Sequence, residues 1–350
     1  MTTNIPTPEE SGAAIDVLRK EWGARLLILG HHYQDSEVLR HADAIGDSLE
    51  LARVAARATS AERIVFCGVR FMAESADLLS QGRRAVYMPA VNAGCPMADM
   101  AEITQVERAW RALTGMAPDW LPVAYVNSSA EIKSFCGRQG GLTCTSSNAA
   151  TAFEWVFKQQ KRVFFLPDEH LGANTAHDLG LADEAVLTYD PRAWDGGLTG
   201  ERPKPARVIA WKGFCPIHMV FPLIRIREIR RRWAGALIIV HPETPKEIVR
   251  LCDAHGSTAQ IIRYVAALPR GATVFVGTEA HLVRRLADEH QSRGVNVQLI
   301  APSFCPNMAK TNPRNLLNLL REWPDAARIK VPAATADPAR TALERMLALG

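Results

Sequence analysis

The hydrophobic pattern of the chain repeats three times. In each repeat an apolar run ends in a polar tip and continues into an amphipathic segment, which predicts a strand followed by a helix. The three runs are RLLILGHHYQDSEVLR (25–40), LPVAYVNSSAEIK (121–133) and GALIIVHPETPKEIVR (235–250). Aligning them on His31, Asn127 and His241 places each of these anchor residues at the end of a predicted strand.

Further segments follow each anchor in the same order. A hydroxyl-rich turn opens a helix, a second strand and helix come next, and a short strand then ends near a cysteine. The turns are GDSLELAR from Gly46, TCTSSNAATA from Thr143 and GSTAQIIRY from Gly256; the second strands begin near Arg63, Arg162 and Ala272; the cysteine tips span 85–100, 211–221 and 297–312. A match in so many segments indicates three copies of one structural unit.

The spacing supports this alignment and identifies an insertion. Cys95 and Cys305 each lie 64 residues after their anchors at positions 31 and 241, whereas Cys215 lies 88 residues after position 127. We expect the extra residues of the middle copy in the Gly- and Pro-rich stretch YDPRAWDGGLTGERPKP (189–205), as a surface loop.

Alternating strands and helices of this length predict an α/β fold with three homologous three-layer αβα domains and mostly parallel sheets. We expect domains at 1–100, joined by the C-terminal helices 313–350, at 101–220 with the loop insertion, and at 221–312. Functional groups in such domains lie beyond the carboxyl ends of the strands. Pseudo-threefold symmetry would therefore bring three sets of strand ends to one central active site.

Composition and charge narrow the class of protein. The 350 residues are 47% hydrophobic and 22% charged, as in globular proteins, and the longest apolar runs are too short to cross a bilayer. A net charge of +4 does not indicate nucleic-acid binding. The polar, acidic first residues lack the features of a signal peptide, so we expect a cytoplasmic protein with reduced thiols. The basic run at 224–233 predicts the solvated face of a surface helix.

The chain has seven cysteines, an odd number that does not suit a framework of paired disulfides. None of them form a CxxC pair. Four have no counterpart in the other copies: Cys67, Cys136, Cys144 and Cys252. Of these, Cys67 and Cys252 are interpreted as small buried hydrophobic residues. Cys136 and Cys144 flank a glycine-rich loop. A role in redox regulation is considered for these two residues, but the sequence does not establish it.

The three equivalent cysteines are the candidate metal ligands, because a pseudo-threefold fold would direct one thiolate from each domain toward the axis. Soft thiolates select zinc, cuprous copper or iron-sulfur clusters. A cubane-type cluster held by Cys95, Cys215 and Cys305 would leave one iron able to bind substrate. Zinc is the competing interpretation, with His218 as a fourth ligand. The residues alone leave both open.

The hydroxyl-rich turns predict anion binding. Free backbone N–H groups at a helix N-terminus favour anions, and Ser or Thr adds donors, although each turn alone is typical of a helix cap. Three such turns around Ser48, Ser146 and Ser257 would suit a substrate with several carboxylates or a phosphate. No GxGxxG follows a predicted strand, so a dinucleotide site is not expected. Side chains that can transfer protons occur at the polar tips of the first strand of each repeat: His31, Tyr33, Tyr125, His241 and Glu243.

Eleven ordered motifs support a family resemblance: HHYQ, GDSLELAR, FMAE, CPMADM, YVNSSAEIK, CTSSNA, CPIH, HPET, GSTAQI, GTE and CPNMAK. From His31 to about Asn318 the chain resembles quinolinate synthases. The resemblance implies three αβα domains around a pseudo-threefold axis and one 4Fe-4S cluster bound by three cysteines. It also implies condensation of iminoaspartate with dihydroxyacetone phosphate to quinolinate, with loss of phosphate and water, in NAD biosynthesis.

Carried over by motif, the resemblance implies specific site residues. The cluster ligands are Cys95, Cys215 and Cys305. The substrate-contacting residues are His31, Tyr33, Ser48, Tyr125, Asn127, Ser146, His241, Glu243, Ser257 and Thr258. The open iron would act as a Lewis acid, and we interpret Glu243, with Tyr33, Tyr125 and His241, as the catalytic proton-transfer group. The sequence departs from the pattern of the family at two places. Thr244 stands where many relatives have a cysteine, and Leu299 and Pro302 stand where some relatives have the two cysteines of a CxxC motif.

Two other function classes stay open as alternatives. One is a zinc-dependent aldolase or hydrolase that uses the same three thiolates, and the other is a non-enzymatic protein that binds small anions or metal. The expected partners are the two small substrates, with a functional coupling to an aspartate oxidase or dehydrogenase as a further possibility. Neither a nucleic acid nor a membrane is expected as a partner.

Overall fold

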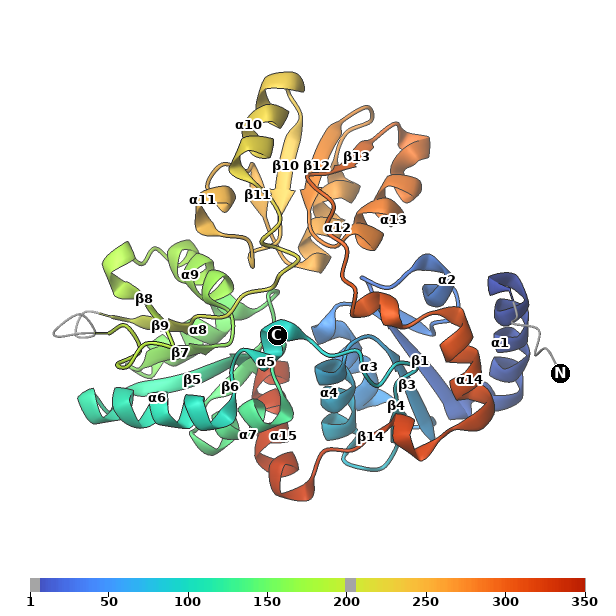
Figure 1. The fold of residues 1–350 in the computed structure, drawn as a ribbon, viewed down its shortest axis with the longest axis horizontal. Coiled ribbons are helices and arrows are strands. Elements are labelled where there is room, and N and C mark those ends of the chain that lie inside the picture. Colours follow the sequence, from blue (N-terminus) through green and yellow to red (C-terminus); the bar gives the residue numbers. More distant parts are fainter. Residues whose placement is uncertain (1–6, 199–205, 350) are drawn as a thin grey trace. The chain divides into compact units, whose positions relative to one another are not determined.

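The structure is a computed structural model that describes residues 7–198 and 206–349. The chain divides into two compact units, each described separately below. The first unit contains Met1–Cys95 and Cys305–Pro332, and the second contains Pro96–Phe304 and Ala333–Gly350. Figure 1 labels their helices and strands.

One five-stranded sheet forms the first unit, in the order β14-β4-β3-β1-β2. The strands are β1 (Leu26–His31), β2 (Ala44–Gly46), β3 (Arg63–Cys67), β4 (Ala85–Tyr87) and β14 (Arg328–Ile329). All neighbours are parallel except β14, which is antiparallel to β4. An apolar cluster joins one face to α1 (Pro8–Trp22), α2 (Ser36–Leu39) and α14 (Pro313–Glu322). Helices α3 (Ser48–Arg57) and α4 (Arg70–Ser80) pack together outside that cluster.

The second unit contains two sheets. Its five-stranded sheet, which we call the middle sheet, has the order β6-β5-β7-β9-β8 and is parallel throughout. Its strands are β5 (Trp120–Tyr125), β6 (Leu142–Cys144), β7 (Arg162–Leu166), β8 (Val186–Tyr189) and β9 (Val208–Trp211). Helices α6 (Ile103–Met116), α7 (Ala130–Arg138) and α15 (Ala333–Ala348) share an apolar core with this sheet. Helices α8 (Ala149–Lys158) and α9 (Glu169–Asp178) also pack against it.

The four-stranded sheet of the second unit, which we call the third sheet, has the order β11-β10-β12-β13 and is also parallel. Its strands are β10 (Leu237–Val240), β11 (Ala254–His255), β12 (Thr273–Gly277) and β13 (Asn296–Leu299). Helices α10 (Leu223–Arg232) and α11 (Lys246–Val249) share its core, whereas α12 (Thr258–Ala267) and α13 (Ala280–His290) pack on each other. The short elements are α5 (Pro96–Asp99), η1 (Gly23–Arg25), η2 (Asp183–Ala185), η3 (Gln291–Arg293), η4 (Met308–Lys310) and η5 (Asp325–Ala327).

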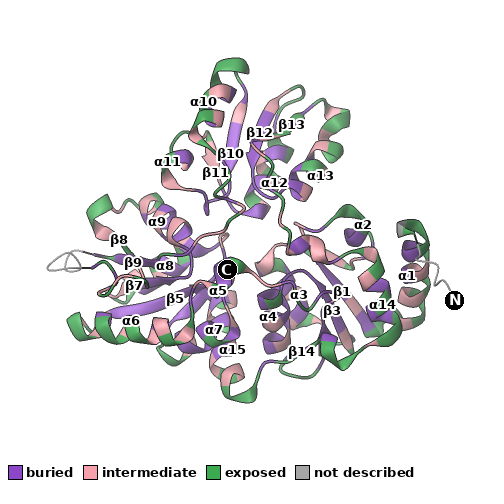
Figure 2. Ribbon diagram, in the orientation of Figure 1, coloured by how far each residue is buried: buried purple, intermediate pink, exposed green. Residues whose placement is uncertain are grey.

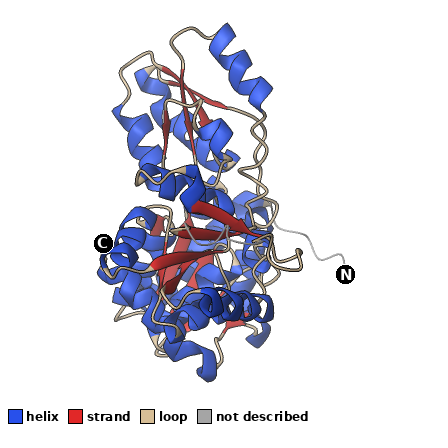
Figure 3. Cartoon of the chain, turned by 90° about the vertical axis from the view of Figure 1, so that its left-hand side faces the viewer, coloured by secondary structure: helices blue, strands red, loops and turns tan. Residues whose placement is uncertain are grey.

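Strand order confirms the α/β fold with three mostly parallel sheets. The four repeated strands are ordered β4-β3-β1-β2, β9-β7-β5-β6 and β13-β12-β10-β11, so the fourth, third, first and second strands of each copy are always neighbours. Parallel neighbours require a crossover, and the helix between successive strands provides it. Figure 3 shows strands flanked by helices, and Figure 2 shows that burial is concentrated in the strands. The helix predicted from the basic run is α10, which buries Ile226 and Ile229.

The hydrophobic pattern missed five of the described strands, one of which is the two-residue β14. Strands β2, β6 and β11 precede the hydroxyl-rich turns, but two or three residues are too few to show alternation. Strand β8 extends the edge of the middle sheet, so part of the extra length of the middle copy is a paired strand. In the predicted loop at 189–205, Tyr189 ends β8, residues 191–197 form turns and a bend, and 199–205 lie outside the described residues.

The C-terminal helices divide between the two units. Helix α14 packs against α1 in the first unit. Helix α15 instead packs against α7 and β6, and Thr143 donates to the carbonyl oxygen of Ala342 at 3.2 Å. The apolar residues of α15 decide this position, since Ala339, Ala342 and Leu343 are buried there. The expected domain boundaries otherwise stay a prediction. Among the described helices, none has the length and apolar content needed to span a membrane.

We expect Gly137→Ala to destabilise the second unit. Helix α15 passes so close to α7 that a Cβ atom on Gly137 would lie 1.9 Å from the carbonyl oxygen of Pro338. Overpacking of this kind costs about 1–3 kcal/mol. Urea denaturation followed by circular dichroism measures the change in the free energy of unfolding.

Gly115→Ala is the matched control, because Gly115 lies in α6 and a Cβ atom there would meet nothing within 4 Å. Ala is the better helix former, so this variant should be more stable by about 0.5–1 kcal/mol. Equal unfolding midpoints for the Gly137 variant and the unmodified protein would show that α7 and α15 do not approach so closely.

Candidate active site

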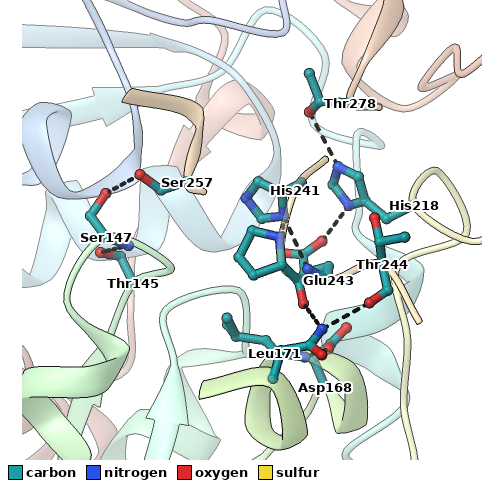
Figure 4. Close-up of polar contacts among 12 residues, drawn as sticks. Thr145, Ser147, Asp168, Leu171, His218, His241, Glu243, Thr244, Ser257 and Thr278 are labelled. Atoms are coloured by element: carbon teal, nitrogen blue, oxygen red, sulfur yellow. Dashed lines mark hydrogen bonds and ion pairs between the residues drawn. The ribbon is translucent and has the colours of Figure 1, made fainter. Parts of the chain in front are cut away.

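Polar side chains from both sheets of the second unit meet beyond the carboxyl ends of their strands. Glu243 follows β10, Tyr125 ends β5, His218 follows β9 and Thr278 follows β12. Figure 4 shows His218 between Glu243 and Thr278. The Nδ1 atom of His218 lies 2.6 Å from Oε2 of Glu243, and its Nε2 atom lies 3.3 Å from the hydroxyl of Thr278. Both sheets therefore contribute to one hydrogen-bonded group.

The Glu243 carboxylate is buried and ionised. Burial acts to raise the pKa of Glu243, but His241, His218 and hydrogen bonds from His218 and Tyr125 outweigh it and hold the pKa at about 2. An ionised carboxylate only accepts hydrogen bonds, so Nδ1 of His218 is the donor. The hydroxyl of Thr278 can then donate to Nε2 of His218. Glu243 is a hydrogen-bond acceptor in this arrangement.

His241 is buried in its neutral form. Burial lowers the pKa of His241 to about 3, against the opposing charge of Glu243. Its Nδ1 atom accepts the backbone N–H of Glu243 at 3.3 Å, and its ring stacks on that of His218 with centroids 4.4 Å apart. Because Nδ1 accepts, the proton of the neutral ring lies on Nε2. His241 therefore presents a neutral N–H donor.

The first unit repeats this tip geometry. Nδ1 of His31 accepts the backbone N–H of Tyr33 at 3.2 Å, and the two rings pack edge to face with centroids 4.7 Å apart. His31 is buried and Tyr33 half-buried. The HHY and HPE tips thus hold their histidines by the same backbone contact.

Asp168 is a site residue that the sequence did not reveal. It caps α9 through Oδ1, which accepts the N–H of Leu171 at 2.6 Å, and it is fully buried. Its Oδ2 atom has no hydrogen-bond partner in the described part of the chain. Burial and the charge of Glu243 raise the pKa of Asp168. The pKa values of two neighbouring carboxyl groups are thereby shifted in opposite directions.

The predicted hydroxyl residues occupy different positions at their helices. Ser257 caps α12 and also accepts a hydrogen bond from Ser147, which joins the hydroxyl turns of the middle and third sheets at 2.9 Å. Thr258 is the first residue of α12. Ser146 is half-buried beside Ser147, and Asn148 holds the cap position of α8.

Ser48 and Asn127 complete the set of predicted substrate contacts. Ser48 begins α3, but Asp47 is its cap and accepts from Leu49 and Glu50. The side-chain oxygen of Asn127 is buried and has no partner among residues 7–198 and 206–349. It is therefore an acceptor available to a bound molecule.

Each candidate cluster ligand is a half-buried cysteine. In the first unit, Cys95 and Cys305 lie on segments joined by the ammonium of Lys310, which donates to the carbonyl oxygen of Asn92 at 2.7 Å. Gln34 of the HHYQ tip also donates to the carbonyl oxygen of Met308 at 3.0 Å. Cys215 belongs to the second unit, so the convergence of the three thiols stays a prediction.

Two further side chains that could bind a metal ion lie near Cys215. One ligand atom each from Cys215, His218 and Glu243 can be chosen so that all three lie within 4.8 Å of one another. A Cys, His and carboxylate set can bind zinc. The His218 considered for the zinc alternative is therefore close to Cys215, although it already bonds Glu243 and Thr278.

The remaining cysteines are poor metal ligands. Burial raises the pKa of the Cys67 and Cys252 thiols to about 12, and it raises the pKa values of Cys136 and Cys144 as well. Metals bind the thiolate. Cys67 and Cys136 lie in apolar cores, and Cys252 packs against a third core.

Comparison with known proteins identifies the family. The family model described as "Quinolinate synthetase A protein" matches residues 13–348. A quinolinate synthase of Acidobacterium capsulatum is 44% identical over 341 residues, covering 95% of this chain and 91% of that protein. Those of Anoxybacillus flavithermus (46% identical; 97% and 94% covered) and Bacillus subtilis (43%; 96% and 92%) are similarly close. The chain therefore belongs to the quinolinate synthase family, whose members are enzymes of NAD biosynthesis.

Proposed function

We propose that the chain condenses iminoaspartate with dihydroxyacetone phosphate to form quinolinate, with loss of phosphate and water. The observation that carries this proposal is the buried, ionised Glu243, which accepts hydrogen bonds from His218 and Tyr125 beside the neutral His241. Condensation and dehydration require protons to be removed from carbon and delivered to leaving oxygen atoms. The ionised Glu243 carboxylate can take up a proton, and the neutral His241 ring offers an N–H group to a leaving oxygen.

We also propose that Cys95, Cys215 and Cys305 hold one 4Fe-4S cluster. Their half-buried thiols lie in equivalent places of three repeats, and the chemistry of the other cysteines supports this choice, since those thiols resist deprotonation. Held by these three thiolates, a cluster would retain one iron without a protein ligand and would supply Lewis-acid chemistry to the site.

The protein residues then divide into binding and proton-transfer groups. Ser48, Ser146, Ser257 and Thr258 begin or precede helices, where backbone N–H groups favour the carboxylates and phosphate of the substrates. The unpaired oxygen of Asn127 would accept from a substrate donor, and the Nε2–H groups of His31 and His241 would donate to substrate oxygen. Glu243 would take up a proton, with Tyr125 and Tyr33 as further proton-transfer groups.

Oxidation of the amine of aspartate would supply iminoaspartate, an imine that hydrolyses readily in water. We therefore propose a functional coupling to an aspartate oxidase or dehydrogenase, through the supply of this unstable imine.

An anaerobic assay tests the proposed reaction. Protein purified without oxygen is analysed for iron and sulfide, and is then given iminoaspartate and dihydroxyacetone phosphate while quinolinate is measured. We expect a brown protein that forms quinolinate. A colourless zinc protein that forms none would favour the zinc-dependent alternative, for which the Cys215, His218 and Glu243 group is the supporting observation.

A further inference from the structure

Asn174 makes a buried contact between the two sheets of the second unit. It lies within α9, which belongs to the middle sheet, and its side chain is almost fully buried. Its side-chain nitrogen lies 2.8 Å from the carbonyl oxygen of Pro242 and 2.9 Å from that of Thr244. These two carbonyl groups belong to the residues on either side of Glu243.

The chemistry of this contact requires an amide nitrogen. A carbonyl oxygen can only accept, so both hydrogen atoms of the Asn174 amide are donated, one to each carbonyl. The backbone N–H of Thr244 also bonds the carbonyl oxygen of His241 at 3.0 Å, which closes a turn over residues 241–244. Asn174 thus holds this turn at two points, and Glu243 lies between them.

Helix α9 is itself held firmly on the middle sheet. Asp168 caps its N-terminus, and Gly172 allows a close approach, since a Cβ atom there would lie 2.7 Å from the ring of Phe165. Asn is unfavourable in the interior of a helix, so a tertiary contact has to compensate for it at this position. The two bonds to the Glu243 turn provide that contact.

We propose that Asn174 is a positioning residue for Glu243. Of the partners of the Glu243 carboxylate, Tyr125 ends a strand of the middle sheet and His218 lies in the segment that follows another, whereas Glu243 itself follows a strand of the third sheet. Asn174 ties the Glu243 turn to the middle sheet, so that the carboxylate keeps its place among these partners. This inference rests on the proposed function, in which Glu243 transfers a proton.

Replacing Asn174 with Leu or Asp tests the proposal. Leu has a similar volume but donates nothing, and Asp places oxygen atoms against both carbonyl groups. Misplacement of a catalytic group by about 1 Å can cost 100-fold in rate. We therefore expect kcat to fall about 100-fold in Asn174→Leu, with a much smaller change in KM and with the cluster absorbance unchanged. Asn174→Asp should also lose most of its kcat.

A second measurement does not depend on the reaction. Hydrogen–deuterium exchange, read by mass spectrometry in peptides that cover residues 241–248, should be faster in both variants than in the unmodified protein. Exchange in peptides of the first unit should be unchanged, which separates loss of this contact from general unfolding. If the unmodified protein forms no quinolinate, the proposed function fails, but the exchange measurement still decides whether Asn174 holds the turn.

Asp183→Asn is the matched control. Asp183 forms ion pairs with Lys246 and Arg250 across the same two sheets, but these pairs are at the surface and do not involve the Glu243 turn. This control should keep its kcat within about twofold, as expected for exposed pairs. Unchanged exchange at 241–248 in both Asn174 variants, or faster exchange with an unchanged kcat, would overturn the proposal. A loss of kcat in Asp183→Asn as large as in Asn174→Leu would overturn it too.

Discussion

Glu243→Gln is expected to abolish quinolinate formation, with a fall in kcat of about 1000-fold or more. Proton transfer by a positioned side chain contributes roughly 100- to 10,000-fold, and the Gln amide cannot take up the proton. Gln has almost the same size as Glu and keeps one oxygen that can accept from Tyr125 or His218. The buried group should therefore retain its packing while it loses its charge.

The measurements separate chemistry from assembly. The cluster absorbance and the iron content of Glu243→Gln should equal those of the unmodified protein, while quinolinate formation falls. Glu247→Gln is the matched control, because Glu247 is exposed on the neighbouring helix α11 and should tolerate the same change. Full activity of Glu243→Gln would remove Glu243 from the mechanism.

Changing Cys95, Cys215 or Cys305 to Ser is expected to remove both colour and activity. A hydroxyl is a harder and far less acidic ligand than a thiol, so it replaces a thiolate poorly in an iron-sulfur site. With three protein ligands for one cluster, loss of any one should reduce iron from about four atoms per chain to a small fraction of that. Anaerobic purification, iron and sulfide analysis and the absorbance spectrum measure the effect.

Cys252→Ser is the control for these variants. Cys252 is half-buried, as the three proposed ligands are, and its thiol donates to the carbonyl oxygen of Ile248, which a Ser hydroxyl can also do. This variant should keep its iron and its activity. Three ligand variants that each kept a full complement of iron would contradict the proposed ligand set. Zinc bound through Cys215 alone of the three would instead support the His218 and Glu243 site.

The repeat explains why so much of the fold was predictable. Strands β1, β5 and β10 are apolar runs with a polar end, and this local pattern is sufficient to locate them and to align His31, Asn127 and His241. The predicted helices after each tip are α2, α7 and α11. Short elements lacked such a pattern: β11 has two residues, and its pairing with β10 depends on the neighbouring strand.

The residues around Glu243 were predictable to different degrees. Glu243 and Tyr125 belong to strand-end tips, where polar groups after an apolar run are conspicuous. Asp168 resembled an ordinary helix cap, and Asn174 one polar residue within a helix. Their significance depends on the third sheet, which supplies the Glu243 charge and the two carbonyl oxygens that they meet.

By itself the sequence determined the three repeats, the α/β class, the equivalent cysteines and the family, because these depend on residue order and periodicity. Tertiary structure alone decided that α15 packs on α7, that His218 bonds Glu243 rather than standing free as a ligand, and that the pKa values of Asp168 and Glu243 shift in opposite directions. The physical reason is that such features arise between residues distant in sequence, through burial and short contacts that no local pattern encodes.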